Sequence, residues 1–393
     1  MNILKISKFP PIEGGESSKA YWITRELCQK GFNIYLLTNA FEVEDKYRCK
    51  LNAKDINLLT IPNLKIFNTS PFNIPNFIPF YNPYDLKLIS KGIEIIENYR
   101  IDVIEGSYLL PYGFVASYLS SLFNIPLIIT HAGSDMTRLL GSSHFSPVLI
   151  KVLKSAHRIV TFTNGTDIFQ KFDIESKRIT EMKSFINTNV FSPTHNKINM
   201  SELIGREVKG TILSHFGKME RGKGIFNLIE SISKIKNDYT LIFFGDGRDF
   251  DKIKELVISS KIFDKTVFHP FIPPWEMPLY ISASDCVLSV EHNFGVNIHG
   301  PILPRESMSS GVPVLISNEI RFYNMLKEYD DGIIKTNPGD NKDFTKKLTK
   351  IIQNENNFLI NVGNNGRKWI KKNVNMNEII EERAKMYYEM INN

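Results

Sequence analysis

Short apolar runs alternate with amphipathic segments along most of this chain, and this alternation restricts the fold more than any other feature of the sequence. The runs expected to form strands in the first half are residues 2–7, 32–38, 58–61, 65–68, 101–105, 125–130 and 159–163. Those in the second half are residues 211–216, 240–244, 266–269, 286–290 and 312–316. Segments with helical periodicity lie between them, for example residues 86–99, 114–122 and 250–259. Because strands that alternate with helices build parallel sheets covered by helices, the sequence predicts an α/β fold of doubly wound domains.

The length of the chain and one polar stretch indicate how these segments divide. The chain has 393 residues, about two or three times the usual length of one domain. Residues 193–209 are polar and irregular, as in a linker. We therefore expect an N-terminal domain over residues 1–192 and a C-terminal domain over residues 210–376, with a cleft between them that the strand ends face. A last helix within residues 377–393 is expected to cross back onto the first domain.

Charge and cysteine content narrow the classes of function. The net charge of +6 comes from 48 basic and 42 acidic residues that are mostly interspersed. No concentrated basic and aromatic track is found, so no nucleic-acid partner is expected. The three cysteines, Cys28, Cys49 and Cys286, are far apart and form no disulfide framework. A reducing cytoplasm fits this pattern.

Membrane contact, if there is any, is expected to be peripheral and at the inner face of the membrane. Lys5 and Lys8 interrupt the first apolar stretch, which therefore lacks the core of a signal peptide. No apolar run approaches the ~18 residues that a membrane-spanning helix needs. Residues 71–83, PFNIPNFIPFYNP, are rich in proline and aromatic side chains. They are either a loop packed on their own domain or a lip that touches lipid or a hydrophobic acceptor.

The stretch from Gly217 to Gly224, GKMERGKG, is the strongest candidate for a ligand site. It joins the predicted strand 211–216 to an amphipathic segment at 225–235 and carries Lys218 and Lys223. A glycine turn before a helix offers free backbone N–H groups, and two ammonium groups would add positive charge there. The stretch is either a solvated lysine-rich loop or a binding site for phosphate.

Other candidate residues follow predicted strands. His131 and Asp135 come directly after the apolar run 125–130, where ligands of open α/β sheets bind, although a single histidine is more often structural. Gly14 and Gly15 follow the first strand, and Ser17 or Ser18 is expected to cap the next helix. Gly245 and Gly247 form a sharp turn after residues 240–244.

These segments together resemble the retaining GT-B glycosyltransferases of group 1, the family 4 type. The matching text includes GG after the first strand, DVIEGSYLLPYGFVA, IPLIITHAGSD, INTNVFSP, FGKMERGKGIFNLIESI, FFGDGRDFDKIKEL and ESMSSGVPVLIS. Each string is modest, but their order and spacing over most of the chain are fairly specific. The resemblance implies two Rossmann-like domains that face a central cleft. It further implies a nucleotide-sugar donor on the second domain, an acceptor on the first, and no required metal or other cofactor.

The resemblance also implies roles for single residues. Lys218, where the family usually has Arg, and Lys223 would bind and stabilise the donor diphosphate, and Glu306 would contact the ribose. His131 would hydrogen-bond the transferred sugar. The remaining residues assigned to the donor side are Gly15, Gly217, Gly245, Gly247, Glu291, His299 and Gly300, and those assigned to the acceptor side are Gly14, Gly15 and Asp135.

Two departures from the family pattern leave alternatives open. The acid expected eight residues before Glu306 is replaced by Ile298, so either Glu291 reaches the site across a longer loop or His299 and the Gly300 amide take its place. In the first domain Ala132 is inserted between the histidine and the glycine of the usual His-Gly-Ser-Asp pattern. Asp135 or a shifted backbone could therefore serve in place of His131.

We expect a cytoplasmic, metal-independent hexosyltransferase that moves a sugar from a UDP- or GDP-linked donor to an acceptor hydroxyl with retention. A glycan or lipid-linked acceptor is expected. The alternative is a non-catalytic nucleotide-sugar-binding partner or regulatory subunit of a transferase. A GT-B epimerase or phosphorylase is a weaker alternative.

Overall fold

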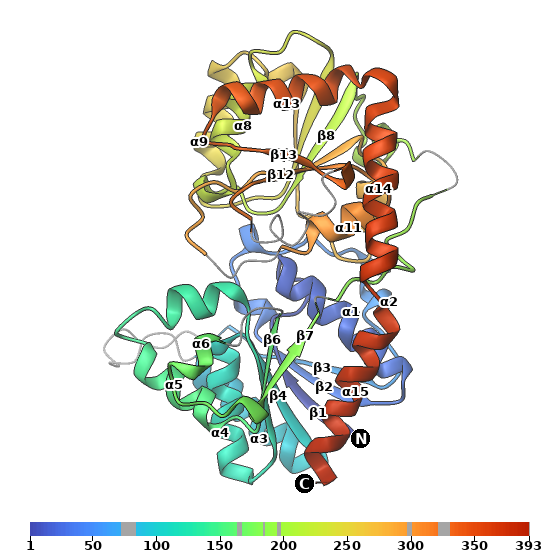
Figure 1. Cartoon of the computed structure of the whole chain (residues 1–393). Coiled ribbons are helices and arrows are strands. Elements are labelled where there is room, and N and C mark those ends of the chain that lie inside the picture. Colours follow the sequence, from blue (N-terminus) through green and yellow to red (C-terminus); the bar gives the residue numbers. More distant parts are fainter. Residues whose placement is uncertain are drawn as a thin grey trace.

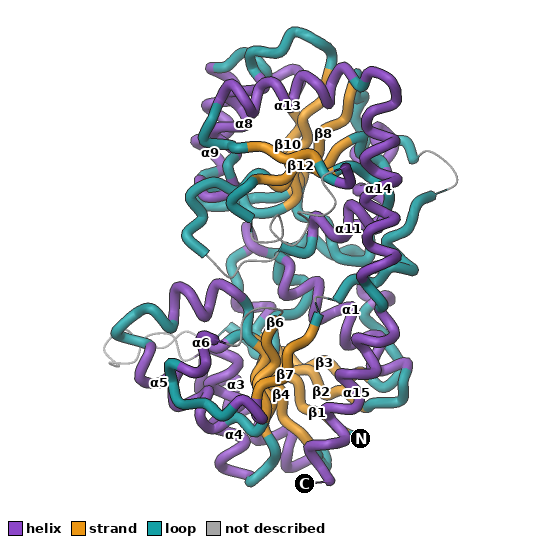
Figure 2. The backbone as a smooth tube through the Cα atoms, in the orientation of Figure 1, coloured by secondary structure: helices purple, strands orange, loops and turns teal. Residues whose placement is uncertain are grey.

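The computed structural model describes residues 1–71, 84–162, 167–183, 185–194, 198–296, 301–320 and 331–392. Residues 72–83 of the predicted apolar segment and the predicted site residues His299 and Gly300 lie outside these ranges. Figure 1 shows two lobes joined along one side by long helices, and Figure 2 shows that the strands gather inside each lobe with helices around them.

The first lobe is built on a parallel sheet of seven strands in the order β3-β2-β1-β4-β5-β6-β7. Alternate residues of its strands enter two different cores: Ile3 and Val103 pack on one face, and Leu4 and Ile104 on the other. This explains why the strands are apolar runs without alternation, as expected of a sheet buried on both faces. The strands are β1 (Asn2–Ile6), β2 (Asn33–Thr38), β3 (Leu64–Asn68), β4 (Val103–Ser107), β5 (Leu127–Thr130), β6 (Arg158–Phe162) and β7 (Ile179–Met182).

Helices cover both faces of this sheet. One face carries α1 and the last helix α15, and the other carries α3, α4 and α5. The helices of the first lobe are α1 (Gly15–Gln29), α2 (Ala53–Leu58), α3 (Tyr84–Asn98), α4 (Phe114–Phe123), α5 (Ser146–Ser155) and α6 (Asp167–Gln170).

The second lobe has a parallel sheet of six strands in the order β10-β9-β8-β11-β12-β13. Its strands are β8 (Thr211–Phe216), β9 (Tyr239–Phe244), β10 (Thr266–His269), β11 (Cys286–Ser289), β12 (Val314–Ser317) and β13 (Ile334–Thr336). Its helices are α7 (Met200–Ile204), α8 (Ile225–Ile232), α9 (Phe250–Ser259), α10 (Met277–Ser282), α11 (Leu303–Ser309), α13 (Asn341–Gln353) and α14 (Phe358–Asn373). Two parallel sheets with helices on both faces confirm the predicted α/β class and its doubly wound lobes.

The helix α15 (Met376–Asn392) follows α14 down from the second lobe and lies along the first, as the red ribbon in Figure 1 shows. It packs on α1 and β4. Arg383 Nη2 lies 2.6 Å from Glu105 Oε1, Lys5 Nζ lies 3.0 Å from the same oxygen, and the Tyr387 hydroxyl donates to Glu105 Oε2. Burial alone would raise the pKa of Glu105, but Arg383 and Lys5 outweigh it and lower that pKa.

Four local features differ from the predictions. The helix α7 forms within residues 193–209, which were expected to be an irregular linker, and Met200 and Ile204 pack on the second lobe. The helix α1 begins after Gly14, and Ser17 and Ser18 are buried inside it instead of capping it. No strand forms at residues 58–61: Asn52 and Asp55 make a capping box that starts α2, this helix ends at Leu58, and residues 59–61 belong to the connection that leads to β3. The short strands β7 and β13 were not predicted.

Candidate active site

A cavity of about 900 Å³ lies between the two lobes and is lined by both. The first lobe contributes the segments that follow β1, β4 and β5, and the second contributes those that follow β8 and β11 together with the start of α11. The carboxyl ends of the strands of both sheets thus meet at one place, which is where ligands bind in open α/β sheets.

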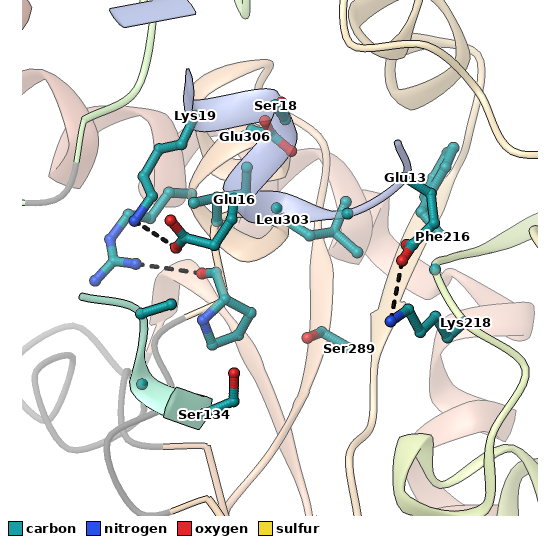
Figure 3. A pocket seen from close by; sticks show the side chains of 18 of the residues that line it. Glu13, Glu16, Ser18, Lys19, Ser134, Phe216, Lys218, Ser289, Leu303 and Glu306 are labelled. Carbon is teal, nitrogen blue, oxygen red and sulfur yellow. Dashed lines mark hydrogen bonds and ion pairs between the residues drawn. The ribbon is translucent and has the colours of Figure 1, made fainter. Parts of the chain in front are cut away.

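The turn after β8 places two lysines on this cavity. Lys218 Nζ lies 3.1 Å from Oε1 of Glu13, which belongs to the first lobe, and Figure 3 shows this ion pair across the cavity. Lys223 ends a short 3-10 helix, Arg221–Lys223, and its Nζ lies 2.5 Å from Glu291 Oε1. Burial would lower the pKa of Lys218, but the Glu13 carboxylate outweighs it and raises that pKa. Lys218 is therefore a cation at neutral pH.

Glu291 reaches the cavity, which was the first of the two alternatives for the missing acid. It follows β11 and is 6% exposed, and Lys223 holds its carboxylate. The Phe294 ring lies beyond it, with Lys223 Nζ 4.3 Å and the Arg138 guanidinium carbon 4.8 Å from its centre. Arg138 comes from the first lobe, so this loop also connects the two sides of the cavity.

Glu306, on α11, lines the cavity although it is only 2% exposed. Within the described ranges its carboxylate has neither a hydrogen bond nor an ion pair. Burial raises the pKa of Glu306 to about 8, so the carboxyl group is mostly protonated at pH 7. The neighbouring Arg305 donates to the Pro301 carbonyl oxygen at 3.2 Å.

The side chains of His131 and Asp135 do not line the cavity, which differs from the prediction that they face the sugar or acceptor. His131 is buried with Nε2 2.7 Å from Thr161 Oγ1, and burial lowers the pKa of its ring to about 4. The Asp135 carboxylate accepts backbone N–H bonds from Leu109, Ala132 and Met136. Both side chains thus hold the loop after β5, and it is residues 132–134 of this loop that reach the cavity.

The predicted glycines separate into two groups. Gly14, Gly15 and Gly217 line the cavity, and Gly14 has a φ of +105° that favours glycine. Gly245 and Gly247 are buried beneath the turn after β8 and do not line it. A Cβ at Gly245 would lie 2.0 Å from the Gly217 carbonyl oxygen, and one at Gly247 would lie 2.6 Å from that of Met219. Their lack of a side chain lets the two turns pack together.

Several polar residues of the cavity were not predicted from the sequence, and two of them are Glu13 and His215. Glu13 stands directly before the glycine pair, and an acid at the edge of a predicted binding turn was a signal for it. His215 is an unusual polar residue near the end of the apolar strand β8 and is 3% exposed. Neither of its ring nitrogens finds a hydrogen-bond partner in the described part of the chain, and burial lowers its pKa to about 4. His215 is therefore a neutral side chain that could bond to a ligand or to water.

The described residues contain neither a metal-binding cluster nor a membrane-spanning helix. No group of three or more His, Cys, Asp or Glu side chains is placed to hold a metal ion. No helix among these residues has both the length and the apolar character needed to cross a membrane.

Comparisons with solved structures support the two-lobed arrangement. Sucrose-phosphate synthase from Thermosynechococcus elongatus aligns with a TM-score of 0.75 and 15% identity over 99% of this chain and 98% of that one. HepE from Anabaena, in complex with UDP and glucose, aligns with a TM-score of 0.73 and 16% identity over 99% of this chain and all (100%) of that one. At this identity the likeness shows the shared GT-B fold.

Sequence comparisons identify the family. N-acetyl-alpha-D-glucosaminyl L-malate synthase from Bacillus anthracis is 22% identical over 97% of this chain and 95% of that protein. Alpha-monoglucosyldiacylglycerol synthase from Streptococcus pneumoniae is 20% identical over 81% of this chain and 71% of that protein. The family model for glycosyl transferases group 1 matches residues 198–369, and that for glycosyl transferase 4-like proteins matches residues 22–164. Since these two models cover most of both lobes, the chain belongs to the group 1 glycosyltransferases.

Proposed function

We propose that this protein transfers a hexose from a nucleotide-sugar donor to an acceptor hydroxyl with retention of the anomeric configuration. The observation that carries the proposal is that Lys218, Lys223 and Glu306 line the same cavity between the lobes. The solved structure of HepE with UDP and glucose supports a UDP-linked donor, and a GDP-linked donor is the other candidate. The names of the Bacillus and Streptococcus relatives support the synthesis of a glycoconjugate.

The two lysines would bind the donor diphosphate and counter the charge that it gains as it leaves. In sugar transfer the bond to the leaving oxygen stretches while the sugar becomes cation-like, so negative charge builds up on the diphosphate. Cations already fixed at that place stabilise the transition state more than the ground state. Because Lys218 and Lys223 supply this charge, the proposed reaction needs no metal ion. Lysine at position 218 provides a point charge without the bidentate fork of arginine.

The remaining residues would orient the donor and acceptor. Glu306 would bond to the ribose hydroxyls, and the backbone at Gly14 and Gly15 would let the diphosphate and acceptor approach closely. Residues 132–134, which line the cavity, would face the sugar. To take the role that the resemblance implies, the His131 side chain would have to give up its hydrogen bond with Thr161 and form one with a sugar hydroxyl instead.

We also propose that the enzyme works in the cytoplasm, on a glycan or lipid-linked acceptor at the inner face of the membrane. The net charge of +6 and the apolar sequence of residues 71–83 support this location. Sedimentation of the protein with anionic vesicles, compared with neutral ones, tests it, and equal recovery in both supernatants would contradict membrane contact.

A panel of labelled nucleotide-sugars tests the activity. We expect slow release of nucleoside diphosphate from one donor, faster with acceptor and unchanged by EDTA. Binding without any turnover, with plausible acceptors present, would instead favour a nucleotide-sugar-binding subunit, for which the inward orientation of His131 is the supporting observation.

The Lys223→Ala variant tests the diphosphate assignment. Loss of a charge-assisted contact should weaken the binding of the preferred nucleotide-sugar by about 10- to 100-fold in ligand-observed NMR. Lys234→Ala, at an exposed position outside the cavity, is the matched control. Parent-like affinity in Lys223→Ala would show that the assignment is wrong.

A further inference from the structure

Glu13 is an acid from the first lobe that holds one of the two lysines assigned to the donor diphosphate. It lies in the segment between β1 and α1, and its side chain is only 3% exposed. Its Oε1 is 3.1 Å from Lys218 Nζ and 3.8 Å from Lys8 Nζ. Although Lys218 is near enough for an ion pair, this buried oxygen accepts no hydrogen bond of good geometry from the residues that the structure describes. The carboxylate therefore holds Lys218 mainly through the attraction of opposite charges.

The donor diphosphate and the Glu13 carboxylate would both bind the same cation, Lys218. A diphosphate bound at Lys218 brings negative charge to a place that already has a carboxylate about one ion-pair distance away, and like charges at this range repel. Lys218 has the length to turn from the carboxylate towards the cavity, because it lies on the rim of the turn with 35% of its side chain exposed. Glu13 then keeps Lys8, whose Nζ also donates to the Glu13 backbone oxygen at 2.9 Å.

We propose that Glu13 is a positioning residue that competes with the donor diphosphate for Lys218 and thereby speeds the release of the nucleoside diphosphate product. This inference rests on the proposed function, since it needs a diphosphate at Lys218. After the sugar has been transferred, the Glu13 carboxylate forms its ion pair with Lys218 again, so the nucleoside diphosphate product is bound less tightly. The same exchange breaks and reforms an ion pair between the two lobes, so product release is coupled to contact between them.

Glu13→Gln tests the competition while keeping the shape of the side chain. The parent and the variant are titrated calorimetrically with UDP, GDP, ADP, CDP and TDP, and dissociation rates are measured for each one that binds. We expect Glu13→Gln to bind the preferred nucleoside diphosphate about fivefold more tightly and to release it more slowly. The corresponding nucleoside monophosphate, which lacks the second phosphate, should bind with a smaller change.

Glu16→Gln is the matched control. Glu16 lines the same cavity, but its Oε1 pairs with Lys19 at 2.7 Å instead of Lys218. Both variants remove one negative charge from the cavity, so a general electrostatic effect would change both affinities alike. In a Lys218→Ala background the effect of Glu13→Gln should vanish, because the shared cation is gone.

A second variant covers the case in which Glu13→Gln does not fold. Glu13→Asp keeps the negative charge but shortens the side chain by one methylene group, which withdraws the carboxylate from Lys218. This variant should therefore also bind the nucleoside diphosphate more tightly than the parent. If the parent binds a nucleoside diphosphate and neither variant binds it more tightly, the competition is overturned and the proposed function stands. If the parent binds none of the five, the proposed function falls and the inference falls with it.

Discussion

Replacing Glu306 by glutamine should make the empty protein more stable, and more so as the pH rises. Burial raises the pKa of this carboxyl from 4.5 to about 8. The folded state therefore holds the proton more tightly than the unfolded state, and stability is lost as the pH rises from about 4.5 to about 8. At 1.36 kcal/mol for each pKa unit, the loss is about 1 kcal/mol at pH 5, about 3 kcal/mol at pH 7 and about 5 kcal/mol at pH 9. The neutral amide of the Glu306→Gln variant carries no such penalty.

Urea-induced unfolding of the parent and Glu306→Gln, followed by tryptophan fluorescence at pH 5, 7, 8 and 9, measures the difference. The gain in the free energy of unfolding should grow by about 4 kcal/mol between pH 5 and pH 9, with most of the growth below pH 8. Glu230→Gln changes an exposed position on α8 in the same lobe, and its effect should vary little with pH. A gain for Glu306→Gln that is the same at all four pH values would refute the assigned protonation of Glu306.

Two further substitutions test parts of the structure that support the site. Glu105→Gln leaves Lys5 and Arg383 without their shared carboxylate and should lower the free energy of unfolding by about 3–5 kcal/mol in a urea titration. The control is Glu389→Gln, a half-exposed position on the helix that carries Arg383. It should lower the free energy of unfolding by less than about 1 kcal/mol. Gly245→Ala places a Cβ 2.0 Å from the Gly217 carbonyl oxygen, so the turn at Gly217 has to move. This substitution should destabilise the second lobe by about 1–3 kcal/mol. It should also weaken the binding of the nucleoside diphosphate, measured by calorimetry. Unchanged binding in a folded Gly245→Ala protein would show that the turn at Gly217 tolerates displacement.

The buried strands could be predicted from the sequence because both of their faces lie in a core. The strand β8, in the middle of its sheet, has the same bounds as the apolar run that predicted it. The edge strands β7 and β13 carry Glu181 and Lys335, so neither shows a continuous apolar run. Residues 58–61 suggested a strand by their apolar composition, but Leu58 ends the helix that the capping box of Asn52 and Asp55 begins, and residues 59–61 form the connection to β3.

Residues that line the cavity could be predicted from the sequence where they directly follow a predicted strand. Lys218 follows the end of β8, and the parallel topology brings that end to the cavity. The orientation of His131 could not be predicted, because it depends on Thr161 of the neighbouring strand. The pairing of Lys218 with Glu13 could not be predicted either, since it depends on how the two lobes approach each other.

The cluster around Glu105 has a consequence for the order in which the chain folds during synthesis. Arg383 and Tyr387, which bind Glu105 inside the first lobe, are made 278 and 282 residues after it. Until a ribosome has added them, Lys5 alone offsets the Glu105 charge, and the face of the sheet that α15 covers is open. The first lobe thus begins to fold first, but its native core is complete only after the last helix of the chain has been made.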